Sequence, residues 1–286
     1  MKTIKCVNDN GMFVEFTYDH DATEFFLVSA DGIYNMDNAI STTQNATTDG
    51  STYAGEAIQQ RNIVITAQMR RNYQENRNLL SMVFCNRAQG TLYHIENGQS
   101  KKIRYRAENL NIEEKGILRV ATISLICTNP YFSDGEPENI EMSGWEDYFE
   151  FPIEISESGM EFGIRKKELI KSIENNSTTS IGITMTITAE DIVVNPAIIN
   201  VTTQETLKLL CTMLPNDRVV VTTEQGNIDV VLYRDNEMMN YNYTVDEDNE
   251  DYIQLEPGHN DISYTADEGR DYMSVSFTFE NQYTMP

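Results

Sequence analysis

The side chains with the most chemical potential in this sequence are its histidines, its cysteines and its 45 carboxylates. His20, His94 and His259 lie far apart, and none has a second His or Cys at the spacing of a metal-ligand pair. The cysteines are equally scattered, at Cys6, Cys85, Cys127 and Cys211. Because they form no CxxC pair, they are typical of reduced, mostly buried thiols in a protein made in the cytosol. We therefore expect no metal site and no cofactor.

Catalytic signatures are the next feature to consider. The sequence contains no GxSxG elbow, P-loop or GxGxxG, and no cysteine with a local protease signature. A glycosidase-type Asp–Glu pair needs only the right separation in space, so the sequence leaves that arrangement open. The acidic run 246–251 could offer oxygens to Ca²⁺, but it lacks the spacing and central glycine of an EF-hand, and a solvated loop is the simpler interpretation. We expect the chain not to be an enzyme.

The net charge of −24 is unevenly distributed along the chain. Residues 1–60 carry 2 basic and 9 acidic side chains, residues 61–119 carry 11 and 5, and the remainder carries 8 and 31. So acidic a chain is poorly suited to nucleic-acid phosphates, and we expect no nucleic-acid partner. No run of about 18 apolar residues is present, and the start lacks the features of a signal peptide, so we expect no membrane partner.

The basic middle of the chain needs an explanation of its own. Its side chains form two groups, Arg70, Arg71 and Arg77 beside a predicted helix, and Lys101, Lys102, Arg104 and Arg106 on a predicted strand. One interpretation is a solvated face. The other is a surface that meets an acidic surface on a second copy of the chain.

Short alternating or β-branched segments predict strands over much of the first 130 residues, at 3–7, 12–18, 25–28, 61–68, 90–96, 101–110 and 117–127. Residues 35–60 are polar and lack an apolar period, which predicts a long loop or an extended arm. Apolar residues at helical spacing predict one helix over 72–86, begun by a capping box of Asn72 and Glu75.

Composition changes after residue 132, where acidic residues, Gly and Pro replace the alternating pattern. We therefore predict an N-terminal domain over 1–133, a linker over 134–150 and a C-terminal domain over 151–286. The second domain again reads as short strands, at 181–188, 206–211, 218–223, 228–233, 261–266 and 272–279. This spacing favours an antiparallel β-sandwich or barrel.

Several ordered motifs resemble the distal tail proteins of long-tailed phages that infect Gram-positive bacteria. In the N-terminal half they are Tyr53-Ala-Gly-Glu56, Arg61-Asn-Ile-Val-Ile-Thr66, Leu79-Leu80-Ser-Met-Val-Phe84, Gly90-Thr-Leu-Tyr93 and Asn129-Pro-Tyr-Phe132. In the C-terminal half they are Asn195-Pro-Ala-Ile-Ile-Asn200, Arg218-Val-Val-Val-Thr-Thr223 and Leu255-Glu-Pro-Gly-His-Asn260.

The resemblance implies a mainly β protein. Its N-terminal part would be a β-sandwich with one helix and an extended arm or hairpin, and its C-terminal part an antiparallel β-sandwich like a galectin or a carbohydrate module. It also implies a structural role at the virion tail tip, where six copies form a ring that joins the tail tube to the tip. The implied partners are the tail tube protein, the C-terminus of the tape-measure protein and a lysin-type tail-tip hub protein.

Two kinds of surface follow as hypotheses. Contact between copies would use Tyr53, Arg61 and the two basic groups. The alternative function is recognition of host-wall carbohydrate, because sandwiches often bind sugars on exposed aromatic rings. The candidate platform residues are Trp145, Tyr233, Tyr241 and Tyr243, although ordinary core or surface tyrosines are the simpler interpretation.

Overall fold

The computed structural model describes residues 2–19, 21, 24–44, 49–85, 87–115, 118–147, 163–167, 170–224 and 226–286, without the side chains of 115, 143–147, 163–167 and 250. The chain divides into two compact units. Unit 1 comprises Met1–Gly135 together with Gln282–Pro286, and unit 2 comprises Glu136–Asn281. The range 134–150, expected as a linker, contains two strands, and the last five residues group with unit 1 because they pair with its sheet.

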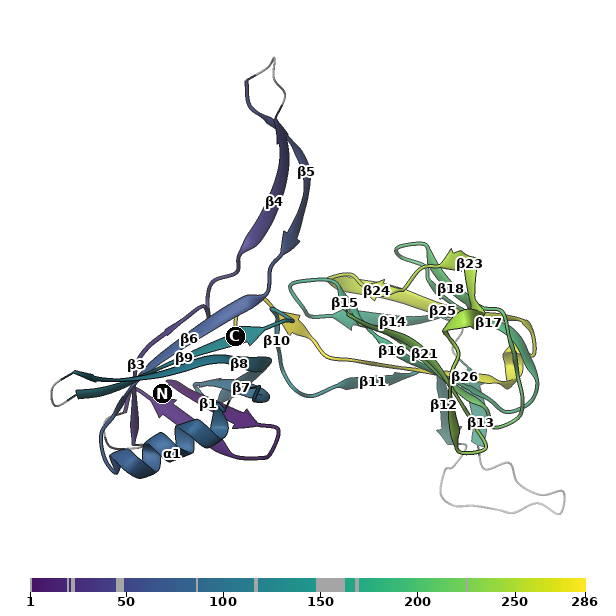
Figure 1. Cartoon of the computed structure of the whole chain (residues 1–286). Coiled ribbons are helices and arrows are strands. Elements are labelled where there is room, and N and C mark those ends of the chain that lie inside the picture. The colour runs from purple at the N-terminus through teal and green to yellow at the C-terminus, as the bar shows by residue number, and fades with distance from the viewer. Residues whose placement is uncertain are drawn as a thin grey trace. The chain divides into compact units, whose positions relative to one another are not determined.

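Unit 1 is built from eleven strands and one α-helix in its described part (Figure 1). Their bounds are β1 (Lys2–Asn8), β2 (Phe13–Thr17), β3 (Phe25–Asp31), β4 (Asn38–Gln44), β5 (Ser51–Ile58), β6 (Arg61–Met69), α1 (Tyr73–Val83), β7 (Gln89–Glu96), β8 (Gln99–Lys115), β9 (Leu118–Cys127), β10 (Phe132–Ser133) and β27 (Gln282–Tyr283).

The main sheet of unit 1 closes on itself. Its strands run in the order β27-β10-β8-β7-β1-β2-β3-β6-β9, and β9 pairs back with β8. The first half of β8 pairs with β7 and the second half with β9, with a register shift between Ala107 and Asn109. We expected an N-terminal sandwich, whereas this strand turns a corner and closes a barrel of β1, β2, β3 and β6 to β9. Alternation along a strand does not reveal its neighbours, so the sequence could not show the closure.

The inside of the barrel is filled by large apolar side chains, and α1 adds to them. Leu80 and Val83 of the helix are fully buried in this core, and the Phe84 ring lies 6.4 Å from Phe16. The helix is shorter than the predicted 72–86, and the predicted capping box is wrong. Asn72 takes a left-handed backbone conformation without a side-chain cap, and its amide donates to the carboxylate of Glu24 at 3.2 Å.

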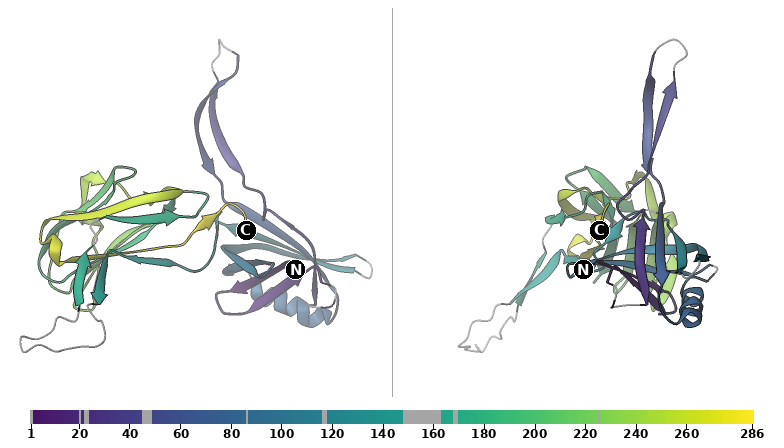
Figure 2. Two further views of the ribbon diagram at one scale, coloured as in Figure 1. Left: turned by 180° about the vertical axis from the view of Figure 1, so that it is seen from behind. Right: turned by 90° about the vertical axis from the view of Figure 1, so that its left-hand side faces the viewer.

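The polar stretch between β3 and β6 forms an extended hairpin, the arm, made of β4 and β5. Figures 1 and 2 show it standing away from the barrel of unit 1 in every view. Its strands are rich in Thr, Ser and Ala, and nearly all of their side chains are exposed. The sequence-based prediction of an extended arm over 35–60 is therefore confirmed, although the arm is a hydrogen-bonded ribbon and not a loop.

Unit 2 consists of short strands and two 3₁₀ turns. Their bounds are β11 (Glu138–Glu141), β12 (Ser143–Asp147), β13 (Gly163–Lys167), β14 (Ile170–Asn175), β15 (Ile181–Gly182), β16 (Thr184–Ala189), β17 (Val193–Asn200), β18 (Glu205–Leu209), β19 (Thr212–Met213), β20 (Arg218–Glu224), β21 (Asn227–Arg234), β22 (Glu237–Asn240), η1 (Asn242–Thr244), β23 (Val245–Glu250), β24 (Gln254–Leu255), β25 (Gly258–Glu268), η2 (Arg270–Tyr272) and β26 (Met273–Phe279).

Two antiparallel sheets of unit 2 share one core. One sheet has the order β11-β26-β16-β20-β21-β22 and the other β14-β25-β17-β18-β23. Buried side chains of the first sheet, such as Val221 and Phe277, belong to the same cluster as Ile198 and Ile262 of the second. Because side chains of both sheets belong to a single cluster, the two sheets bury one common core. The mainly β class predicted from the sequence is thus confirmed.

Gly90 allows a test of the barrel packing. A Cβ at this position of β7 would lie 2.1 Å from the backbone oxygen of Val7 and 2.7 Å from the hydroxyl of Tyr105. We expect Gly90→Ala to lower the free energy of unfolding of unit 1 by about 1–3 kcal/mol, because the crowded atoms must move apart. The neighbouring Thr91→Ala, on the outer face, should cost about 0.5 kcal/mol. Urea unfolding of both variants provides the measurement, and equal losses would contradict the packing.

Candidate functional site

One face of the arm carries several large side chains that are exposed to solvent. Ile40 is 61% exposed, Tyr53 60% and Ile58 41%. Ile40 pairs with Glu56, and a register shift in β5 places Tyr53 opposite Thr42, on the same face as Ile40. Without the extra residue in β5, alternation would turn Tyr53 to the opposite side of the ribbon. The bulge therefore gathers two aliphatic side chains, one aromatic ring and one carboxylate on a single uncovered face.

Such an arm is short of stabilising contacts in the isolated chain. A two-stranded ribbon with no sheet or helix packed on it is only marginally stable in water. Segment 35–60 contains no Lys or Arg, and its carboxylates are Asp37, Asp49 and Glu56. An acidic ribbon with exposed Ile and Tyr side chains is suited to a partner surface that is both basic and apolar.

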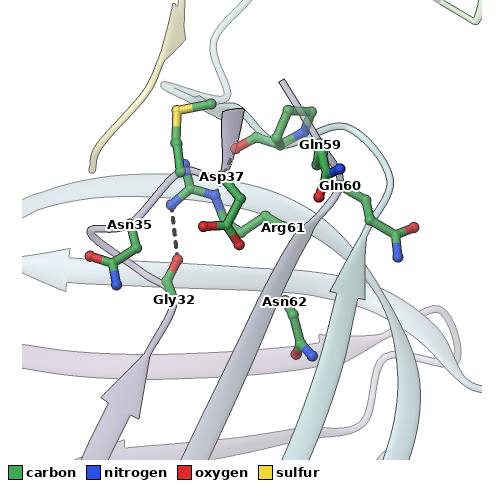
Figure 3. A pocket seen from close by; sticks show the side chains of 9 residues that line it. Gly32, Asn35, Asp37, Gln59, Gln60, Arg61 and Asn62 are labelled. Carbon is green, nitrogen blue, oxygen red and sulfur yellow. Dashed lines mark hydrogen bonds between the residues drawn. The ribbon is translucent and has the colours of Figure 1, made fainter. Parts of the chain in front are cut away.

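The root of the arm is organised around Arg61, the first residue of β6 (Figure 3). Its Nη1 donates to the backbone oxygens of Gly32 at 3.0 Å and Ile33 at 2.6 Å, just before the arm begins. Its Nε donates to the oxygen of Pro130 at 2.8 Å, shortly before the chain leaves for unit 2. Its Nη2 donates to the oxygen of Thr284 at 2.6 Å, in the segment that returns. One guanidinium thus holds three distant stretches of chain.

This placement changes the role that the sequence suggested for Arg61. The residue is 4% exposed, and its guanidinium lies 5.0 Å from the centre of the Phe132 ring. Burial lowers the pKa of Arg61, and the nearby thiol of Cys127 opposes that effect. Arg61 was expected at the contact between copies. Its side chain is instead enclosed within unit 1, so it can act on the arm only through the backbone that it holds.

A small pocket of about 200 Å³ lies beside Arg61 at the root. Figure 3 shows amide side chains from both sides of the root at its wall, among them Asn35, Gln59 and Asn62, together with Asp37. These groups donate and accept hydrogen bonds but include no nucleophile with an adjacent base. The pocket can therefore bind polar groups, and it has no catalytic constellation.

The outer surface of the barrel carries a basic face, formed by the first half of β8 with β7, β1 and β2. Strand registers align Arg104, Thr91, Val7 and Phe13 in one row and Lys102, Tyr93, Lys5 and Glu15 in the next. Phe13 is 49% exposed, and the Lys5 ammonium lies 4.1 Å from the centre of its ring.

Charged pairs on the basic face are open to solvent. Lys5 pairs with Glu15 at 3.1 Å, and Arg104 pairs with Asp9 at 3.0 Å with 64% of its side chain exposed. With Lys102 and Arg106, the face has four basic and two acidic side chains. Exposed pairs of this kind are worth little in the isolated chain, so they are available for other contacts.

The other half of the barrel surface, formed by β3, β6, β9 and the second half of β8, is a polar face. Its rows align Asn109, Ser124, Val64 and Asp31, and Asn111, Thr122, Thr66 and Ser29. Glu108 accepts a hydrogen bond from Ser124 at 2.6 Å, and Glu113 lies on the same side. The two outward faces of one barrel thus carry opposite charge.

The other basic residues that the sequence predicted for contact between copies lie at several different places on unit 1. Lys102, Arg104 and Arg106 alternate with the buried Ile103 and Tyr105, as the sequence indicated, and lie on the basic face. Lys101 points the other way, where it pairs with Asp134 and lies 3.2 Å from the centre of the Tyr283 ring. The Arg70 guanidinium lies 4.3 Å from the centre of the Phe26 ring, Arg71 is exposed just before α1, and Arg77 is exposed within α1.

The structure brings two of the four candidate platform residues together. Tyr241 and Tyr243 adjoin at 5.4 Å, edge to face, at the end of β22, and Tyr243 is 78% exposed. Tyr241, however, packs against the core of unit 2. Tyr233 lies on the outer face of β21, where Arg218 covers its ring at 4.5 Å. The side chain of Trp145 lies outside the described residues.

Other chemistry is limited in the described part of the chain. No group of three or more His, Cys, Asp or Glu side chains there is arranged to hold a metal ion. Burial and the nearby charge of Lys2 lower the pKa of His94, while Glu96 opposes that effect. The Nε2 atom of His94 lies 3.3 Å from the Tyr34 hydroxyl. Among these same residues, no helix is long and apolar enough to cross a membrane.

Formal charge is divided sharply between the two units. Unit 1 contains 13 basic and 15 acidic residues (−2), whereas unit 2 contains 8 and 30 (−22), which together give the −24 of the chain. The strand β23 and the residue after it carry five of these acidic groups at one edge of the sandwich. Charged side chains on an edge strand discourage pairing with another chain. Unit 2 therefore carries nearly all of the net charge of the chain.

Comparison with solved structures finds proteins of similar fold. The crystal structure of the phage SPP1 Dit protein, described as a paradigm of the hub adsorption apparatus in phages that infect Gram-positive hosts, aligns with a TM-score of 0.68 over 97% of this chain and 98% of its own. This chain has the fold of the SPP1 Dit protein. The sequences are 11% identical. The resemblance that the ordered motifs suggested is confirmed at the level of the fold.

A second solved structure shares this fold at lower similarity. It is the phage P2 baseplate in its activated conformation with Ca, which aligns with a TM-score of 0.51 and 9% identity over the whole of both chains. The sequence matches no family model and no curated protein sequence. The similarity to Dit is therefore one of strand arrangement and hardly at all of residue identity.

Arg61 provides a test of the root. Arg61→Gln leaves the backbone oxygens of Pro130 and Thr284 without their donors, so we expect it to lower the free energy of unfolding by about 3–5 kcal/mol. Hydrogen exchange should rise in 32–37 and 282–286. Arg104→Gln, an exposed arginine in the same unit, serves as the control and should cost about 0.5 kcal/mol. Similar stability of the two variants would contradict the structural role of Arg61.

Proposed function

We propose that this chain is a distal tail protein, a structural hub of a phage or phage-like tail tip that has no catalytic role. The observation that carries the proposal is the alignment with the SPP1 Dit protein over nearly the full length of both chains, including the barrel and the second unit. A fold can serve several functions, so the geometry of the surfaces must support the assignment as well.

In this proposal several copies, six by the family resemblance, close into a ring at the virion tail tip. A cyclic assembly needs two different surfaces on each subunit, one that meets the next copy and one that meets the previous copy. The arm and the opposite-charged faces of the barrel supply surfaces of this kind. The near-neutral unit 1 would form the ring, and the highly acidic unit 2 would project from it.

The partners in this proposal lie along the tail axis. One side of the ring would contact the tail tube protein and the C-terminus of the tape-measure protein, and the other side a lysin-type tail-tip hub protein. The ring would thus join the tube to the host-adsorption apparatus. A chain of net charge −24 fits this structural role better than one at the nucleic acid, because phosphates would be repelled.

Ring formation is the direct test. The purified full chain, examined by negative-stain electron microscopy and native mass spectrometry across a range of concentrations, should form closed rings with six subunits. Because unit 2 carries −22, mutual repulsion should weaken rings at low ionic strength, and salt should promote assembly. A chain that stays monomeric at every concentration and salt level would contradict the hub assignment.

A second candidate function is carbohydrate recognition by unit 2. The observation in its favour is the adjoining pair of Tyr241 and the strongly exposed Tyr243. We predict that, if this function holds, Tyr243→Ala reduces binding of the full chain to host-wall glycans about tenfold without changing its melting temperature. Tyr272→Ala, which removes another exposed tyrosine of unit 2, is the matched control. Absence of binding by the unmodified chain on a glycan array and on host cells would eliminate this function.

A further inference from the structure

Four polar side chains of unit 2 form a compact cluster where the strand β14, at the edge of its sheet, pairs with β25. The strand register places Ser172 opposite Asp261 and Glu174 opposite His259. Because Ile173, between the two β14 residues, is fully buried, its neighbours point outward, and their partners on β25 alternate in the same way. A serine, a histidine and two carboxylates therefore share one outer surface.

Three atoms of this cluster converge on one point. The Nε2 of His259 lies 3.0 Å from the Oγ of Ser172 and 3.1 Å from the Oδ1 of Asp261. The Ser172 hydroxyl also donates to that same carboxylate oxygen. Two neighbouring ligand atoms of an octahedral metal ion, each about 2.1 Å from the metal, lie about 3.0 Å apart. The three atoms thus have the mutual spacing of one face of a coordination shell.

Glu174 lies on the other side of the imidazole ring, with its Oε2 3.6 Å from the Nδ1 of His259. A histidine that binds a metal through one nitrogen commonly donates the other N–H to a carboxylate, which fixes the tautomer and the orientation of the ring. In that tautomer the Nε2 lone pair faces the Asp261 carboxylate, and the one hydroxyl proton of Ser172 can be donated to only one of them. A cation between these atoms removes the remaining repulsion.

We propose that Ser172, His259 and Asp261 bind a divalent transition-metal ion, with Zn²⁺ preferred, and that Glu174 positions the histidine. An imidazole nitrogen favours Zn²⁺ over Ca²⁺ and Mg²⁺, which take oxygen ligands. The site has two strong ligands and a hydroxyl, and its other coordination positions face solvent, since 61% of the His259 side chain is exposed. It is separate from the proposed hub role and does not depend on ring formation.

The backbone that presents the histidine is already held in place. Asn260 is fully buried, and its side chain accepts a hydrogen bond from the backbone nitrogen of Glu256 at 3.0 Å. The same amide donates to the backbone oxygens of Glu256 at 2.7 Å and Gly258 at 3.0 Å. This network fixes the turn before His259, so the ligand loses little conformational freedom on binding. Segment 255–260, one of the motifs noted in the sequence, thereby acquires a local role.

A bound ion would fasten the edge of the sheet. Among the described strands, β14 pairs only with β25, so it has one neighbour to hold it. An ion with ligands from both strands adds a link that the backbone ladder lacks. The spacing of residues in the sequence did not indicate this site, because Ser172 and His259 are 87 residues apart and meet only through strand pairing.

Titration of the full chain with Zn²⁺ tests the site. A Cys85→Ser background removes the exposed thiol, which would otherwise compete for the ion. Calorimetry should show one tightest site, and His259→Ala and Asp261→Ala should each weaken it more than about tenfold. Glu174→Gln should weaken it about tenfold while leaving the visible spectrum of bound Co²⁺ unchanged, because the ligands themselves remain. Glu237→Gln, an exposed carboxylate on β22, is the matched control and should change neither.

Hydrogen exchange supplies a second measurement. Zn²⁺ should slow exchange in 170–175 of the Cys85→Ser chain and of its Glu237→Gln variant, but not of its His259→Ala variant. Melting temperatures without metal show that each variant is folded. If His259→Ala binds Zn²⁺ as tightly as its parent, or if the parent binds Ca²⁺ as tightly as Zn²⁺, the proposal is overturned. Neither result bears on the hub function, which ring formation tests separately.

Discussion

A single buried cation constrains the architecture of unit 1. The Arg61 guanidinium binds the backbone where the arm begins, where the chain leaves for unit 2 and where it returns. The acceptors are backbone carbonyls, whose dipoles replace the water that burial removes, and loss of the side chain would leave buried oxygens without donors. Gly32 belongs to the same constraint, since its backbone has a φ of +84° and a Cβ there would lie 1.9 Å from the oxygen of Asn62. The arm can project because its base is fixed in this way.

The division of charge distinguishes the two units. Unit 1 is nearly neutral, whereas unit 2 carries a net charge of −22 and therefore repels other anionic surfaces. The edges of the sheets are also kept from pairing with another chain. The barrel closes its sheet through β8 and β9, and in unit 2 the acidic β23 is itself the edge strand of its sheet. Among the described strands of unit 1, β4 and β5 form a two-stranded ribbon that pairs with no further strand.

Much of this could be predicted from the sequence, but only where the information is local. Alternation in segments such as 61–68 and 90–96 located the strands closely, and the polar stretch 35–60 indicated the arm. Barrel closure was missed because it depends on which strands become neighbours. The role of Arg61 was missed for a related reason, since its partners lie up to 223 residues away and are backbone atoms without a residue signature. The bulge that turns Tyr53 to the face of Ile40 was equally invisible, because a register shift has no unique sequence pattern.

Unit 2 is inserted into unit 1, because the chain leaves after β10 and returns at β27, and these two strands pair with each other at Phe132 and Tyr283. Tension on unit 2 is therefore shared by two strands that leave the barrel side by side, and no single proteolytic cut in either connection releases the unit. Under mechanical load, a double tether of this kind is more durable than a single linker. It also makes unit 2 an exchangeable cassette, since another domain with adjacent ends could occupy the same insertion point without disturbing the barrel.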